Sequence, residues 1–338
     1  MKIKQISISI LAVLFVFPLI GTFAQQAANS GSIEVITTFD YPGIGNSTLP
    51  QRINEIGDIV GEFIDSSGVV RGFTRFGNGR FSAPIVDPND TAGFTEGRAI
   101  NNFRKVVGDY LGSDGFIHSF FLSNGAFTEY DVPGAVQTNL LGINELGDVT
   151  GGFDPGSGIF QGFIDRHGTI TSFSVPAATS TFAYEINDTR RLVVGYYLDS
   201  AGTPHGYYRD HNGSLHFPID PPGSIATALF GVNDTNFAVG RYTDASGATH
   251  GLFFVPPDNL FTFDYPESTF TSLNGINLFG FICGRFVDAS GIAHGFIARV
   301  RGIPHSIGAG KPVTPHNPSL AAPLNQSPAA WGGAMPAR

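Results

Sequence analysis

Short apolar stretches alternate with glycine-containing turns along most of the chain, and no segment keeps a helical period over a useful length. In the segment 139–176 the alternation predicts strands over 139–144, 148–153, 159–165 and 169–175. Gly147 lies in the first turn, and Pro176 ends the last strand. Four short antiparallel strands within about 44 residues are the size of one β-propeller blade. The pattern predicts an all-β protein.

The same unit recurs along the chain. An asparagine preceded by Ile or Val repeats at intervals of 47, 43, 43, 46 and 44 residues. A threonine stands six residues before each asparagine, and a glycine in an apolar setting follows it by seven or eight residues. The asparagines are Asn54, Asn101, Asn144, Asn187, Asn233 and Asn277. Three positions that recur together in all six copies indicate a repeat protein.

The ends of the repeat region predict how the repeats are arranged. Complete copies end with a strand that leads into a proline, as in 127–133 and 261–266, but the sixth copy stops at about Gly302 without one. A spare segment of this kind, 36–42, precedes the first copy. We therefore expect a six-bladed β-propeller of four-stranded antiparallel blades over 33–302, closed by the N-terminal strand completing the last blade. An open solenoid is the alternative, although it would not need this split.

Four copies carry Asp-x-x-Gly between the expected second and third strands. Such an aspartate can accept a backbone N–H two residues on, and the glycine takes the left-handed conformation that ends the turn. These turns run from Asp65 to Gly68, Asp199 to Gly202, Asp244 to Gly247 and Asp288 to Gly291. A calcium loop gathers several oxygen ligands at short intervals, whereas each turn offers one carboxylate. The turn is the favoured interpretation, and calcium binding stays open.

The repeat resembles the HAF family of probable extracellular repeats, found mainly in exported bacterial proteins. The resemblance covers essentially the whole repeat region. It rests on the segments Ile143-Asn144-x-x-Gly147-Asp148, Asp288-Ala-Ser-Gly291, His294-Gly295-Phe296 and Asp131-Val-Pro133-Gly134-Ala135. His-Gly-Phe departs from the family's His-Ala-Phe by a smaller middle residue, and other copies depart further. The resemblance implies an exported repeat protein and no particular activity.

The N-terminus predicts export. Lys2 and Lys4 precede an apolar run from about Ile6 to Ile20, and small residues before Gln25 suit cleavage. We expect a signal peptide over 1–24 and a short linker over 25–32; the alternative is a transmembrane anchor, for which the run is short. No other stretch predicts a membrane span. The protein is therefore expected to be secreted, periplasmic or at the cell surface, in the bacterial envelope.

Composition supports a packed, exported fold. Aromatic residues make up 12% of the chain and charged residues only 14%, which disfavours disorder. The net charge of −9 argues against a nucleic-acid partner. Cys283 is the only cysteine, so the chain folds without intramolecular disulfides, and its place among valines in other copies predicts a buried apolar residue. Residues 303–338 are rich in Pro and Ala with no acidic residue, which is typical of a disordered tail.

Residues shared by all copies are expected to be structural. Side chains of the recurring threonines and asparagines can satisfy backbone groups at the two ends of each innermost strand. The histidines on third strands suggest a metal, but they would lie about 10 Å outward from the inner strand and could not converge on one ion. We expect each to hydrogen-bond a neighbouring blade, and we expect no metal and no cofactor. These histidines are His118, His205, His250 and His294.

A site for one asymmetric ligand should use positions at which the copies differ. Two and three residues before the recurring asparagines, most copies carry small or apolar residues, and a few carry large polar ones. Arg52, Arg98, Tyr184 and Glu185 could build an off-centre polar patch in the central channel, and we predict ligand binding there. The alternative is that Arg52, Arg98 and Glu185 only neutralise one another in a wet channel.

Catalytic residues are not evident. Glu96 and Glu185 differ by three positions along strands of different blades, about 10 Å of rise, which is too far for a glycosidase pair. No nucleophile elbow, metalloprotease helix or phosphate loop occurs in the sequence. Burial also argues against Cys283 as a nucleophile.

The sequence predicts an exported, non-enzymatic binding or scaffold propeller, and a monomer. Loops between blades and the Asp-x-x-Gly turns should share one face, where rings and loop amides would suit a glycan; an envelope protein is the other expected partner. One alternative is a hydrolase or lyase at the channel mouth, by analogy of fold alone. A purely structural envelope protein is the other alternative.

Overall fold

The computed structural model describes residues 32–43 and 47–302. They form strands, β1 to β23, joined by turns and loops. The predicted signal peptide (1–24), the predicted linker apart from Ser32, and the predicted tail (303–338) lie outside the described residues. No helix in the described part of the chain has the length and apolar character needed to cross a membrane.

Most strands form short antiparallel sheets, each built from consecutive strands. The three-stranded sheet contains β2 (Thr48–Ile53), β3 (Ile59–Ile64) and β4 (Val70–Arg75). One four-stranded sheet contains β5 (Thr95–Ile100), β6 (Val106–Leu111), β7 (Ile117–Ser123) and β8 (Ala126–Tyr130). The next contains β9 (Gln137–Ile143), β10 (Val149–Asp154), β11 (Gln161–Arg166) and β12 (Thr169–Phe173). Another contains β13 (Ser180–Ile186), β14 (Val193–Leu198), β15 (Pro204–Arg209) and β16 (Leu215–Ile219).

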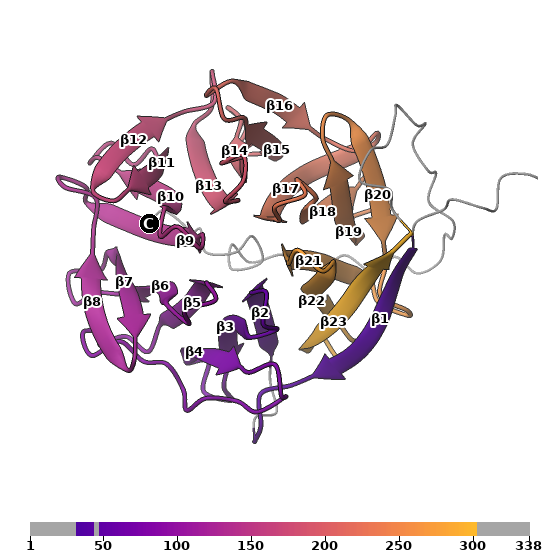
Figure 1. Ribbon diagram of the computed structural model, residues 1–338, viewed down its shortest axis with the longest axis horizontal. Coiled ribbons are helices and arrows are strands. Elements are labelled where there is room, and N and C mark those ends of the chain that lie inside the picture. Colours follow the sequence, from indigo (N-terminus) through magenta and orange to yellow (C-terminus); the bar gives the residue numbers. More distant parts are fainter. Residues whose placement is uncertain (1–31, 44–46, 303–338) are drawn as a thin grey trace, which may run out of the picture.

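The remaining strands belong to one eight-stranded sheet. Its first part contains β17 (Ser224–Val232), β18 (Ala238–Asp244), β19 (Thr249–Val255) and β20 (Asn259–Phe263). Its second part contains β21 (Phe270–Ile276), β22 (Phe281–Val287), β23 (Ala293–Arg301) and β1 (Ser32–Phe39). A single parallel residue pair, Thr249 with Phe270, joins the two parts. The sheets are arranged around a central axis, with the first strand of each group innermost, so the fold is propeller-like (Figure 1).

The N-terminal strand pairs with the end of the repeat region. β1 runs antiparallel to β23, with Ser32 opposite Arg301 and Phe39 opposite Gly295. This is the pairing that the spare segment 36–42 predicted. The strands expected in the third copy are also found, each within two residues of the predicted bounds.

The first sheet corrects one expectation, because it has three strands rather than four. The chain after β4 runs beside it but forms only isolated bridges, Arg75 with Phe81 and Gly72 with Ile85. Pro84 lies between these bridges. Proline has no N–H to donate to a ladder, so a continuous fourth strand is interrupted there.

The recurring asparagine links neighbouring sheets. Asn54 Oδ1 accepts from the backbone N–H of Asp58 at 2.8 Å, within its own turn, while Asn54 Nδ2 donates to Asn101 O at 3.0 Å. The turn contact was expected from the sequence; the inter-sheet contact was not. Equivalent side-chain bonds run from Asn101 to Asn144 O, Asn187 to Asn233 O, Asn233 to Asn277 O and Asn277 to Asn54 O. The last of these connects β21 to β2.

The recurring threonine acts at the other end of the inner strand, as predicted. Thr138 Oγ1 accepts from the backbone N–H of Val132 at 3.0 Å and so fixes the loop that enters the sheet. Thr48, Thr95, Thr181 and Thr271 accept in the same way. Each sheet therefore has two polar ends. We call the end with the recurring asparagines the asparagine face, and the opposite end, with the Asp-x-x-Gly turns, the histidine face.

Apolar side chains fill the spaces between neighbouring sheets. Val107 of β6 packs with Leu140 and Ile143 of β9, for example, and all three are at most 4% exposed. Cys283 is fully buried in a cluster with Ile59, which confirms its prediction as a buried residue. Burial raises the pKa of its thiol to about 12, so the thiol stays protonated and unreactive.

Candidate functional site

A β-bulge sets the polar residues of the inner strands. The pairing of β13 with β14 skips Tyr184, and the pairings of β2 and β5 skip Gln51 and Arg98. The bulge brings the inner strand close to the recurring glycine: a Cβ on Gly151 would lie 1.9 Å from Asn139 O. Only glycine tolerates that approach, which explains its recurrence. A bulge re-aims the side chains beside it, so it sets the directions of the side chains at the positions that differ between copies.

Arg52 and Glu185 meet across the axis. The Arg52 guanidinium forms an ion pair with the Glu185 carboxylate, although the two residues come from β2 and β13. Arg52 also donates to one backbone carbonyl on each of three other inner strands, those of Asn274 at 2.6 Å, Tyr184 at 2.9 Å and Leu141 at 3.4 Å. Arg52 is 4% exposed and Glu185 6%. One side chain thus ties together four inner strands.

Arg98 lies in a separate buried cluster. It forms ion pairs with Glu96 on its own strand and with Asp109 of β6, the latter at 3.0 Å. Asp109 also accepts from Ser119 Oγ at 2.8 Å and from Leu140 N at 3.0 Å. Arg98 thus pairs with Glu96 and Asp109, whereas Glu185 pairs with Arg52.

Tyr184 packs among aromatic rings. Its ring centroid lies 5.0 Å from that of Phe230 and 5.6 Å from that of Tyr196. The ring is 3% exposed, and burial raises the pKa of its hydroxyl. Of the four predicted site residues, the structure brings Arg52 and Glu185 into direct contact, with the Tyr184 backbone beside them. Their binding of a ligand stays a prediction.

The buried charged residues of the second strands were not predicted from the sequence. Buried charged residues follow the recurring glycine in several copies and share the interior with the inner-strand charges: Glu62, Asp109, Arg241 and Arg285. A charge directly after a glycine in an otherwise apolar strand was a visible signal for them. Glu62 accepts from Gln51 Nε2 at 2.7 Å. Burial raises the pKa of Glu62, and burial lowers the pKa of Arg241 to about 9.

The mouth of the channel on the asparagine face is narrow. A cavity of about 60 Å³ opens there, with Arg52, Glu185 and inner-strand isoleucines in its lining. Carboxylates surround it: Glu55, Glu145, Asp188 and Asp234. They are engaged, since Glu55 accepts from Leu278 N and Glu145 from Asn102 N, both at 2.9 Å. Burial raises the pKa of Glu185 to about 7, against the lowering effect of Arg52.

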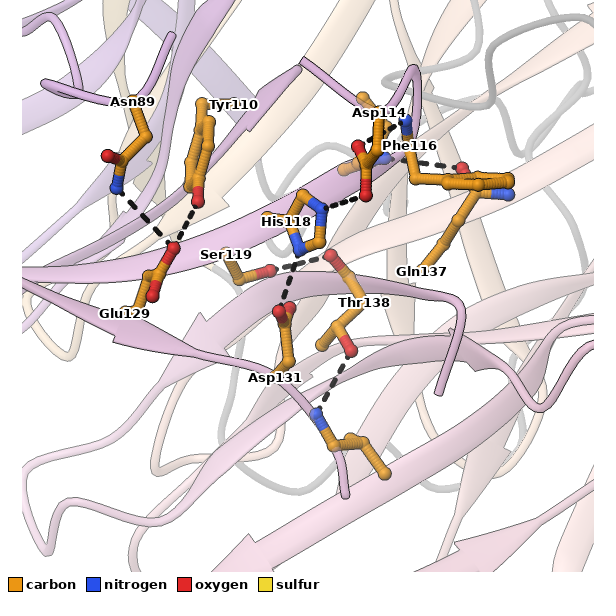
Figure 2. Close-up of polar contacts among 12 residues, drawn as sticks. Asn89, Tyr110, Asp114, Phe116, His118, Ser119, Glu129, Asp131, Gln137 and Thr138 are labelled. Carbon is orange, nitrogen blue, oxygen red and sulfur yellow. Dashed lines mark hydrogen bonds and ion pairs between the residues drawn. The ribbon is translucent and has the colours of Figure 1, made fainter. Parts of the chain in front are cut away.

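A histidine between two aspartates recurs on the opposite face. His118 Nδ1 lies 2.7 Å from Asp131, and Nε2 lies 3.1 Å from Asp114 (Figure 2). The ring stacks on Tyr110 with centroids 5.6 Å apart. The same arrangement holds in the sheet of β13 to β16, with His205 between Asp220 and Asp199, and in both parts of the eight-stranded sheet, with His250 between Asp264 and Asp244 and His294 between Asp40 and Asp288.

These Asp–His–Asp units correct the expectation that the histidines bond a neighbouring blade. Both aspartates belong to the same sheet as the histidine, because the third strand pairs with the fourth and follows the turn after the second strand. Each unit joins that turn, which is Asp-x-x-Gly in three of the four units, to the loop after the fourth strand, so the two loops do share a face, as predicted. Among residues 32–43 and 47–302, no group of three His, Cys, Asp or Glu side chains is arranged to hold a metal.

The units predict a pH dependence of stability. Burial lowers the pKa of His118, His250 and His294, but hydrogen bonds to the paired aspartates raise it more, so each lies above 6.5 in the fold. A raised pKa means that the stabilisation is complete below pH 6.5 and is lost as the pH rises through the raised value. The melting temperature should therefore fall as the pH rises above 6.5.

His250→Gln should make that fall shallower, because it removes one titrating unit. The effect should be less than about 1 kcal/mol, because the paired aspartates are 36% and 47% exposed. Thermal unfolding followed by circular dichroism at several pH values measures it. Glu185 changes stability in the same direction, so the comparison with the variant isolates the histidine. Identical slopes for the two proteins would contradict this assignment.

Comparisons with known proteins identify the fold. No family model matches the chain, and no curated protein matches it. An arginine-to-alanine triple variant of AofleA from Arthrobotrys oligospora is 13% identical, with a TM-score of 0.52, and the match covers 84% of this chain and 91% of that one. A protein assigned as TolB from Agrobacterium tumefaciens is 12% identical, with a TM-score of 0.51, and the match covers 80% of this chain and 98% of that one. The lectin SapL1, in complex with α-methyl fucoside, is 12% identical, with a TM-score of 0.50, and the match covers 76% of this chain and 96% of that one. These likenesses concern the fold.

Proposed function

We propose that this protein is an exported, non-enzymatic propeller of six closed blades that binds glycans on its histidine face. The resemblance of its repeats to exported HAF repeats supports export, to the envelope or the cell surface. Six copies of the repeat support six blades, with the eight-stranded sheet counted as two blades that share one residue pair, Thr249 with Phe270. The β1–β23 pairing and the bond from Asn277 to Asn54 O support closure.

The observation that carries glycan binding is the fourfold repetition of the Asp–His–Asp unit at one face. Asp131 is 36% exposed at its side chain, and Asp114 52%, so both retain free acceptor positions. Neighbouring hydroxyls of a sugar can donate to such carboxylates, and the C–H face of the sugar can pack on a ring. Exposed rings lie close to two units. Phe116 follows Asp114 in the turn of the His118 unit (Figure 2). Phe217 packs against Tyr197, the ring that stacks on His205.

Repetition also suits a glycan physically. Equivalent weak sites around one ring can engage several sugars of one polymer or surface, which raises the overall affinity without new contacts. The lectin SapL1 has a similar fold and is seen with α-methyl fucoside, which supports a neutral sugar as the first ligand to test.

The enzyme alternative has less support. The charged residues with shifted pKa values are buried and paired with one another. The cavity that reaches Arg52 and Glu185 has a volume of about 60 Å³. Pockets that enclose small organic ligands measure roughly 300–1,000 Å³. A substrate would not reach these groups without movement of the inner strands.

A glycan array with the purified chain, followed by titration with methyl α-fucoside, tests the proposal. Asp131→Asn and Asp220→Asn should each weaken binding at their own unit by about tenfold, because a hydrogen bond to a charged acceptor is lost. Asp210→Asn is the matched control, since Asp210 pairs with His216 at 3.3 Å on the asparagine face. No bound glycan would contradict the proposal, and retention of an envelope protein alone would favour the structural alternative.

A further inference from the structure

The fourth copy differs from the others on the asparagine face. Its glycine follows the asparagine by eight residues, whereas the other five copies have seven. The extra residue lies in the turn after β13, where the side-chain oxygen of Asn187 accepts from Leu192 N, five residues on, instead of four as in Asn54 to Asp58. This longer turn presents Arg190 and Arg191. A difference confined to one copy is what a site for an asymmetric ligand requires.

An open pocket of about 390 Å³ lies at this turn. Asp188, Thr189, Arg190, Arg191 and His211 line it, with His211 on the hairpin between β15 and β16. In the described part of the chain, neither Arg190 nor His211 has a hydrogen bond or an ion pair. The Asp188 carboxylate is directed to the neighbouring turn, where it accepts from Glu145 N at 3.0 Å.

Two arginines share one buried carboxylate near the pocket. Arg166 and Arg191 lie 3.8 and 3.4 Å from the carboxylate of Asp148. One negative charge does not balance both arginines. The pKa of Arg209 is lowered, first by burial and then by the nearby charge of Arg166. We call the pocket lined by Asp188, Thr189, Arg190, Arg191 and His211 the basic pocket, to which Arg166 and Arg209 add positive charge from outside its lining.

The basic pocket contrasts with the rest of the molecule. The chain has a net charge of −9, and the channel mouth beside the pocket is ringed by carboxylates. An excess of arginine concentrated in one pocket creates a local positive potential that attracts anions. Guanidinium groups bind planar or tetrahedral oxyanions through paired N–H donors. The geometry therefore favours an oxyanion carried on a larger ligand, with the acidic mouth excluding it from the axis.

We propose that the basic pocket binds the sulfate or carboxylate groups of an acidic polysaccharide. The choice of a sugar rests on the proposed function, whereas the anion site itself rests on the pocket alone. The pocket lies on the face opposite to the Asp–His–Asp units, so the two sites can be tested separately. A protein with both sites would contact a neutral sugar on one face and an acidic polymer on the other.

Binding of the purified chain to immobilised heparin and to polygalacturonate tests the proposal, because the two polymers separate sulfate from carboxylate recognition. Arg190→Gln should weaken binding by about tenfold, through loss of one charge-assisted hydrogen-bond donor. The double variant Arg190→Gln/Arg191→Gln should weaken binding further. Replacing Arg191 by Lys instead of Gln in that double variant should restore part of the binding. Arg80→Gln/Arg299→Gln is the control, because it removes the same charge from the asparagine face outside the pocket.

Each outcome decides the question. Retention on either polymer that is lost in the Arg190 variants supports the proposal, even if no neutral glycan binds the histidine face. Retention on neither polymer overturns it, even if methyl α-fucoside binds. If Arg80→Gln/Arg299→Gln loses as much retention as Arg190→Gln/Arg191→Gln, overall charge alone explains the binding, and the proposal is overturned. Equal binding to a DNA oligonucleotide of matched charge would overturn the assignment to a sugar. Arg190 is exposed, so its variant should keep the fold, and its melting temperature checks this.

Discussion

Arg52→Met should lower the free energy of unfolding by about 3–5 kcal/mol, because it leaves the Glu185 carboxylate buried without its cation. It also removes the donor to the carbonyls of Asn274, Tyr184 and Leu141. Chemical denaturation followed by far-ultraviolet circular dichroism measures the loss. The double variant Arg52→Met/Glu185→Leu should recover part of it, because no unpaired charge then remains.

The loss should depend on pH. The Glu185 pKa of about 7 lies above the ordinary value of 4.5, so the folded state binds a proton that the unfolded state releases. Stability from this group is therefore complete below pH 4.5 and falls as the pH rises through 7. Without Arg52 the pKa should rise further, so Arg52→Met should be less damaging at pH 5 than at pH 8. Equal stability of Arg52→Met and the parent protein would contradict a structural role of the pair.

Gly151→Ala should lower the free energy of unfolding by about 3 kcal/mol or more, because the added Cβ has no space. The yield of folded protein should fall as well. It would lie 1.9 Å from Asn139 O and 2.7 Å from the Phe163 ring. The backbone oxygen cannot move away without disrupting the bulge of β9. Expression yield and the denaturation midpoint measure the effect.

Gly202→Ala is the matched control for that glycine. Gly202 has φ +78° in an Asp-x-x-Gly turn, and a Cβ there would meet nothing within 4 Å. It should cost only the strain of a left-handed residue, about 1–2 kcal/mol. Comparable losses in the two variants would mean that conformation, rather than the contact with the inner strand, explains the recurring glycine.

Predictions from the sequence succeeded where a property depends on nearby residues. Asp65 accepts from Ser67 N at 2.8 Å and Gly68 has φ +80°, as the Asp-x-x-Gly turn predicted. The strands of the third copy and the burial of Cys283 followed from alternation and comparison between copies. These features need only the chemistry of a few adjacent positions.

The candidate sites were harder to predict because their residues are far apart in the chain. Arg52 and Glu185 could be assigned to inner strands, but their pairing needs two strands on opposite sides of the axis to be brought together. The basic pocket needs the turn after β13 to lie beside the hairpin at His211, and the single extra residue of the fourth copy was visible but had no meaning alone.

The sequence by itself determined the repeat, its strands, its turns and the positions at which the copies differ, because each depends on local periodicity and backbone preference. The tertiary structure decided the partners: asparagine bonds between sheets, histidines held within a sheet, and buried charges neutralised across the axis. A partner is fixed by distances through space, and these arise only when the sheets assemble around the axis and exclude water from between them.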